Sequence, residues 1–125
     1  MASSDQENCV SSTAKISTHA KLSVSQLNDN LRRNWVDGRV AWTHGIEQLG
    51  IDTIIKIFEA VHQFDTFTPD NDPYGEHDFG AIYVNGQRIF WKIDYYDRAL
   101  EYGSPDPTDP AVTMRVLTVM LASEY

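Results

Sequence analysis

The sequence has little cysteine, no long apolar run and few basic side chains in its second half. Its one cysteine, Cys9, lies in a polar stretch near the N-terminus, so neither a disulfide framework nor a cysteine-based zinc site can form. No apolar run approaches the roughly 20 residues needed to cross a bilayer, and the first residues lack the basic and apolar blocks of a signal peptide. These absences predict a cytoplasmic protein without a membrane role.

The acidic charge is concentrated in one half of the chain. The formal net charge is -8, and residues 1–58 carry six acidic and six basic side chains, whereas residues 59–125 carry twelve and four. Proteins normally meet nucleic-acid phosphates with lysine and arginine, so this balance argues against direct nucleic-acid binding. The same field would attract a basic groove on another protein, although solubility is the commoner reason for net negative charge.

Length and pattern indicate a single α+β domain. The chain has 125 residues, of which 42% are hydrophobic, enough to form one core. Residues 1–22 are rich in serine, threonine, alanine and lysine, which predicts a flexible tail. We therefore expect one folded unit over residues 23–125.

Two helices are predicted in the first half of this unit. Leu27, Leu31 and Trp35 recur every four residues from Ser25 onward, and Gly38 is available to stop that helix. Asp52 is a suitable N-cap for the second helix. The apolar stripe expected on the second helix comprises Ile51, Ile54, Ile55, Phe58 and Val61.

A β-hairpin is the strongest local signal. Its turn is Asn85-Gly86, and both residue types tolerate the positive φ angles of a type I′ turn. The turn sets the pairing of residues 79–84 with residues 87–95, and residues 39–43 read as a further short strand. The fold class expected is a small antiparallel sheet centred on this hairpin and packed against two or three α-helices.

The third helix is expected near the C-terminal end of the sequence. Asp109 resembles an N-cap, and Pro110 suits the first helical position. Residues 110–121 are apolar around most of a helical circumference. The side chains assigned to the core from this segment are Val112, Val116, Leu117, Val119, Met120 and Leu121.

One pair of titratable residues suggests chemistry. Extending the hairpin register places His77 opposite Asp94, and such a pair can serve general acid-base catalysis or a metal. A structural pair that closes the base of the hairpin is the plainer interpretation. The acidic residues have neither EF-hand spacing nor a helical metal motif, and Phe90 stands where a metal-dependent nuclease would have a carboxylate. We therefore expect no metal and no cofactor.

Acidic and aromatic residues of the second half are the other candidate site. Residues 65–78 contain five acids and no basic side chain, and tyrosines with acids follow the hairpin. Tyrosine is frequent at protein interfaces. The residues predicted to bind a partner are Asp65, Asp70, Asp72, Glu76, Asp78, Asp97, Glu101, Tyr96 and Tyr102.

Four segments resemble an uncharacterised bacterial domain family. They are LRRNW at residues 31–35, NDPYGEHDFG at 71–80, FWKIDYYDRALEYGS at 90–104 and DPTDPAVTMRVLTVMLASEY at 106–125. The resemblance covers roughly residues 26–125 in order and spacing. It implies a domain of unknown function carried on plasmids and other mobile elements, often encoded near antirestriction-type proteins, and it transfers no catalytic residue.

Three functions remain open at this point. The preferred hypothesis is an anti-defence inhibitor of the anti-CRISPR or antirestriction type, which binds the basic nucleic-acid groove of a host protein through its acidic surface. The second is a small metal-dependent or acid-base hydrolase or nuclease that uses His77 and Asp94. The third is a homo-oligomeric accessory or antitoxin-like module, with a homodimer as the simplest form.

Overall fold

Helix α1 begins at a strong capping signal. In the computed structural model, which describes residues 21–125, α1 spans Val24–Asn34. The Ser23 hydroxyl accepts the Gln26 N–H, and the Gln26 side chain accepts the Ser23 N–H, which forms a capping box. The helix ends at Trp35, whose backbone is left-handed with a φ of 56°. The stop expected at Gly38 is therefore wrong by three residues.

Helix α3 spans Ile51–Gln63 and follows a four-residue helix, α2, at His44–Glu47. The N-cap of α3 is Gly50 and not the expected Asp52. Ile54, Ile57 and Val61 form its buried stripe, whereas Ile51 and Ile55 are exposed. Two residues of the stripe that was expected to be buried, Ile51 and Ile55, therefore lie on the surface.

The four strands form one mixed sheet in the order β1-β4-β3-β2. They are β1 at Gly38–Trp42, β2 at Phe79–Val84, β3 at Gln87–Tyr96 and β4 at Met114–Leu121. A short 3-10 helix, η2, follows at Ala122–Glu124. The α+β class is confirmed. The pairs β2-β3 and β3-β4 are antiparallel as expected, whereas β1 pairs with β4 in parallel, which makes the sheet mixed.

The hairpin and its pairing are confirmed, and β3 runs one residue beyond the expected end at residue 95. Asn85 and Gly86 have φ angles of 50° and 80°, and Val84 pairs with Gln87 as expected. Gly80 is required by packing, because a Cβ atom there would lie 2.4 Å from the Trp91 Nε1 atom. The turn and this close approach together define which face of the hairpin is buried.

The helix expected at residues 110–121 is wrong, because most of that segment is strand β4. Asp109 and Pro110 belong to a turn, in which the Asp109 carboxylate accepts the Ala111 N–H at 2.9 Å. Burial in the strand alternates, with Arg115, Leu117 and Val119 on the covered face. The run resembled a buried helix because apolar side chains stand on both faces of the strand, with Leu117 and Val119 on one face and Val116 and Met120 on the other.

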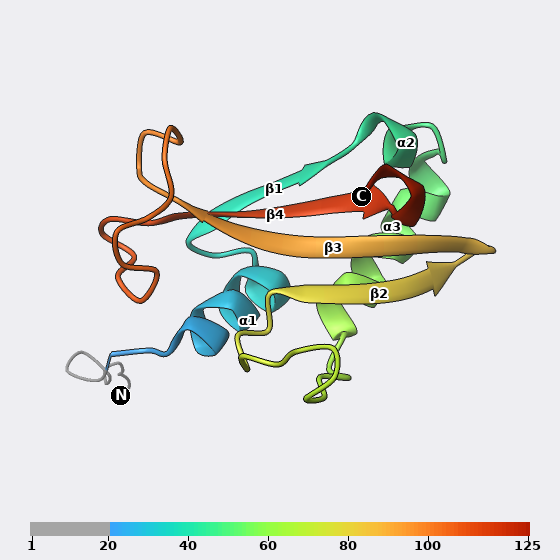
Figure 1. Ribbon diagram of the computed structural model, residues 1–125. Coiled ribbons are helices and arrows are strands. Elements are labelled where there is room, and N and C mark those ends of the chain that lie inside the picture. Colours follow the sequence, from blue (N-terminus) through green and yellow to red (C-terminus); the bar gives the residue numbers. More distant parts are fainter. Residues whose placement is uncertain (1–20) are drawn as a thin grey trace, which may run out of the picture.

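One core lies between the sheet and helices α1 and α3. Figure 1 shows these helices beside the sheet, with β1 and β2 as its two edges. Leu31 of α1 and Ile57 of α3 pack against Trp91, Ile93 and residues of β4. Within residues 21–125, no helix has the length and apolarity to span a membrane. Most of the expected tail, with Cys9, falls outside the described residues.

Candidate functional site

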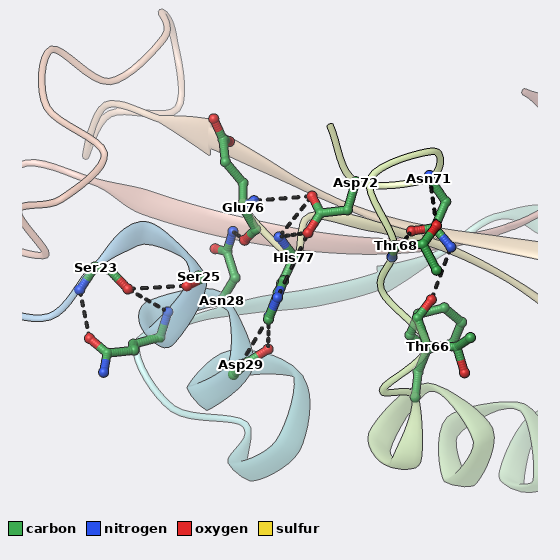
Figure 2. Close-up of polar contacts among 12 residues, drawn as sticks. Ser23, Ser25, Asn28, Asp29, Thr66, Thr68, Asn71, Asp72, Glu76 and His77 are labelled. Atoms are coloured by element: carbon green, nitrogen blue, oxygen red, sulfur yellow. Dashed lines mark hydrogen bonds and ion pairs between the residues drawn. The ribbon is translucent and has the colours of Figure 1, made fainter. Parts of the chain in front are cut away.

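A polar cluster joins α1 to the loop that precedes β2. Figure 2 shows the His77 ring between Asp29 of α1 and Asp72 of the loop. The His77 Nδ1 atom lies 3.0 Å from Asp29 Oδ1, and its Nε2 atom lies 3.7 Å from Asp72 Oδ2. The Asp72 carboxylate also accepts the N–H groups of Glu76 and His77. The ring stacks on Phe67 at 3.9 Å, so the cluster orders the loop.

Arg32 is the fully buried cation beneath this cluster. It donates to the backbone carbonyls of Phe64 at 2.5 Å and Val61 at 3.2 Å, near the C-terminus of α3. It also donates to Asp29 at 2.8 Å. Burial lowers the pKa of the Arg32 guanidinium, while Asp29 opposes the shift. Arg32 therefore supplies the α3 C-terminus with a cation and hydrogen bonds at once.

Asn28 connects α1 to two central strands. Its Nδ2 group donates to the Tyr95 hydroxyl at 2.8 Å and to the Glu76 carbonyl at 2.9 Å. Its Oδ1 atom accepts from Arg115 Nε at 2.8 Å, and the Tyr95 hydroxyl donates to Glu76 Oε1. Burial raises the pKa of Tyr95. The network is satisfied within the protein, which indicates a structural role.

The expected contact between His77 and Asp94 is wrong. His77 has a left-handed backbone, with a φ of 57°, so the hairpin register does not extend to its side chain. Asp94 forms an ion pair with Lys92 at 2.8 Å instead, and it raises the pKa of Lys92 by hydrogen bonding. Within residues 21–125, no group of three or more His, Cys, Asp and Glu side chains could hold a metal ion.

The structure divides the predicted partner-binding residues into two regions. Figure 1 shows the segment between α3 and β2 well apart from the loop between β3 and β4. Asp72 and Asp97 are engaged in loop hydrogen bonds. The members with the most exposed side chains are Asp65, Asp70, Glu101 and Tyr102, whereas Glu76, Asp78 and Tyr96 are half-buried. No single continuous acidic face brings all of them together.

Asp78 lies at the most crowded point of the acidic region. Burial raises the pKa of its carboxyl group, and the charges of Glu76, Asp72 and Asp94 raise it further. The charged form is therefore disfavoured in the fold relative to the unfolded chain. The raised pKa indicates that the negative charges around Asp78 are not neutralised by nearby cations.

Replacing Asp78 by asparagine is expected to stabilise the protein at pH 7. The pKa of Asp78 is raised from the ordinary 3.8. The carboxyl group therefore contributes stability at pH values below 3.8, and this contribution is lost as pH rises through the folded-state pKa. The stabilisation by Asp78→Asn should accordingly disappear near pH 3.5. Urea unfolding of both proteins at the two pH values measures it, and Asp70→Asn is the exposed control. A destabilised Asp78→Asn protein at pH 7 would contradict this assignment.

An exposed aromatic row is the feature that sequence reasoning missed. The rings of Trp42 and Phe58 lie 5.5 Å apart, those of Phe58 and Trp35 lie 5.8 Å apart, and Trp35 lies 5.5 Å from His62. Trp35 and Trp42 are 43% and 44% exposed. Two shallow hollows of about 360 and 350 Å³ lie along the row. The apolar residues of this row are visible in the sequence, but the helical spacing of Trp35 and Ile55 predicted that both would be buried. Both side chains are exposed instead.

The comparisons place this α+β domain in a family. Residues 42–124 match the model of a protein family of unknown function, DUF3768, and the chain belongs to that family. No curated protein and no solved structure matches the chain.

Proposed function

We propose that the protein is a non-catalytic inhibitor of the anti-CRISPR or antirestriction type. Its target would be a host nucleic-acid-handling protein, whose basic groove is occupied by the acidic region before β2. Persistence of a plasmid or other mobile element would be the biological outcome. The proposal rests on charge, because a carboxylate surface can take the place of nucleic-acid phosphates in a basic groove.

The proposal rests on the contacts that the four basic side chains of residues 59–125 make. Lys92 is the one that forms an ion pair with an acid of the described residues. Arg115 is buried against Asn28, Arg98 donates to the Thr113 carbonyl and Arg88 lies over the Phe90 ring. Most of the twelve acids in this half therefore have no neutralising partner within it, and a basic surface would supply one.

The structure also determines which acids can be used in a test. Asp72 is unsuitable, because its side chain is only 6% exposed and holds the loop through the N–H groups of Glu76 and His77. Asp65 and Asp70 are exposed on the same segment. Reversing these two charges changes the surface potential while the polar cluster is left in place.

The test is a pull-down of the tagged full chain from a host lysate that contains CRISPR and restriction proteins, at low and moderate salt. A salt-sensitive complex with a nucleic-acid-handling protein is the expected result. With the purified partner, the double variant Asp65→Lys and Asp70→Lys should weaken binding by about tenfold or more and flatten its salt dependence, since close charge pairs at interfaces couple strongly.

The matched control reverses two exposed acids of α3, Asp52→Lys with Glu59→Lys. Both double variants change the net charge from -8 to -4, because each substitution adds two charges. Equal loss of binding in both would mean that net charge alone attracts the partner. Binding that ignored the Asp65 and Asp70 reversals, or the absence of any nucleic-acid-handling partner, would contradict the proposal.

A further inference from the structure

Among residues 21–125, no strand pairs with the outer edge of β1, which lies beside the aromatic row. Figure 1 shows β1 at the margin of the sheet, with β4 as its one neighbouring strand. Edge strands usually carry charge, proline or a covering element that blocks pairing with another chain. Arg39 supplies one charge on the opposite face of β1. The covered face presents Val40 and the exposed indole of Trp42, which line a shallow hollow with Trp35 and Phe58.

The strand pairing identifies which backbone groups point outward. Thr43 donates its N–H to the Val119 carbonyl of β4 at 3.1 Å, and the direction of these groups alternates along a strand. The N–H and C=O groups of Ala41 and Arg39 therefore point to β4. Those of Gly38, Val40 and Trp42 point away from the sheet.

The outward N–H and C=O groups of one β1 strand can form hydrogen bonds with the same groups of a second copy of the protein. If two β1 strands pair antiparallel about Val40, each Trp42 faces Gly38 of the other copy. Each outward residue can then donate one N–H and accept at one C=O across the pair. Leu31 of the same chain already packs beside Gly38, where a Cβ atom would lie 2.8 Å from the Leu31 Cδ2 atom. The indole of the other copy would therefore meet the apolar side chains of Trp35 and Val36, which precede Gly38 in the chain and are exposed. A two-fold contact of this kind buries the same patch on both copies.

The distribution of charge favours contact between copies at this edge. The described residues 21–58, which include β1, carry five basic and four acidic side chains. The acidic excess lies in residues 59–125, and charges beyond about 10 Å are largely screened at ordinary ionic strength. Repulsion between two chains of charge -8 is therefore smaller when they meet at β1 than when their acidic segments before β2 meet.

Backbone strain provides a second, independent indication. Trp35 and Asp37, on either side of Val36, both have left-handed backbones, with φ angles of 56° and 61°. Such conformations are unfavourable for non-glycine residues and gather at functional segments. Here they hold the exposed side chains of Trp35 and Val36 next to the start of β1.

We infer that the β1 edge and its aromatic row are a homodimer interface, in which two sheets join through antiparallel β1 strands. This surface is separate from the acidic region proposed to meet the host protein. A dimer would carry two acidic regions, both away from the shared edge.

Analytical ultracentrifugation of the full chain over a wide concentration range tests the inference. The weight-average mass is expected to rise from 14.2 kDa toward twice that value. Hydrogen exchange followed by NMR should show that the Val40 and Trp42 amides become protected as concentration rises, whereas Arg39 and Ala41 are protected throughout. A strict monomer, or a dimer in which the Val40 and Trp42 amides stay unprotected, would overturn the inference. The β1 edge would then be available to pair with a strand of another protein.

Two substitutions with the same charge change locate the interface. Trp42→Glu places a carboxylate in the pairing face and should weaken the dimer by about tenfold or more. Ala41→Glu lies on the opposite face and would stand across from Arg39 of the second copy, so it should maintain or strengthen the dimer. Thermal melts check that both variants fold. Equal effects of the two variants would place the contact elsewhere.

Discussion

Replacing Arg32 by alanine is expected to lower the free energy of unfolding by about 4 kcal/mol, because a buried charge network loses its central member. The carbonyls of Val61 and Phe64 would lose the Arg32 donor, and Asp29 would lose its ion pair with Arg32. A cavity would also open where the guanidinium lies 5.4 Å from the ring centroids of both Phe67 and Trp91. Since domains of this size are stabilised by only about 5–15 kcal/mol, most of the stability would be lost.

Urea unfolding measures this effect, with Arg33→Ala as the control. Arg33 is the next residue of the same helix and is exposed, so its loss should change stability by about 0.5 kcal/mol or less. Arg32→Lys keeps the charge but has no planar fork to reach the several carbonyls. We expect it to recover less than half of the loss. Equal stabilities of the Arg32 and Arg33 variants would show that the buried contacts contribute little.

Replacing Asn28 by alanine is expected to cost about 3 kcal/mol, because it leaves buried polar groups without partners. Arg115 Nε, the Tyr95 hydroxyl and the Glu76 carbonyl each lose a hydrogen bond to Asn28. The three groups belong to β4, β3 and the segment before β2. The substitution therefore loosens the attachment of α1 to most of the sheet.

A double-mutant cycle with Arg115→Met separates this network from simple loss of packing. The coupling energy between positions 28 and 115 should exceed about 1 kcal/mol, as for residues that share a buried network. Asn34→Ala, at the exposed C-terminal end of α1, is the control for helix propensity. Additive effects at positions 28 and 115 would mean that their hydrogen bond does not stabilise the fold.

Local sequence signals predicted the elements that depend on near neighbours. The hairpin followed from Asn85-Gly86, since a two-residue turn determines the pairing of both strands. Helix α1 and helix α3 followed from apolar spacing. Strand β4 was missed because both of its faces carry apolar side chains, and such a run cannot be told from a buried helix by periodicity alone. The alternation of Arg115, Leu117 and Val119 with less buried neighbours appears only when the flanking strands are known.

The candidate site depended on contacts between distant segments, which the sequence does not display. His77 was assigned to the hairpin because of its position in the sequence. Its partner Asp29 lies 48 residues earlier, on another element. The aromatic row was hidden for a related reason: a tryptophan at helical spacing usually belongs to the core. Trp35 lies instead at the helix end, where the left-handed turn directs it to the surface.

The parallel pairing of β1 with β4 has a consequence for how the chain reaches its fold. Gly38 and Arg115 are neighbours in the sheet although 115 - 38 = 77 positions separate them along the chain. Pairings of this kind close large loops and slow folding. During synthesis β1 would emerge long before its partner strand β4. Until β4 is made, both edges of β1 would be unpaired and its apolar residues Val40 and Trp42 would be uncovered. The same strand would then be the segment of a nascent chain that is most exposed to misassembly, and the arrival of β4 between β1 and β3 would be the step that ends this exposure.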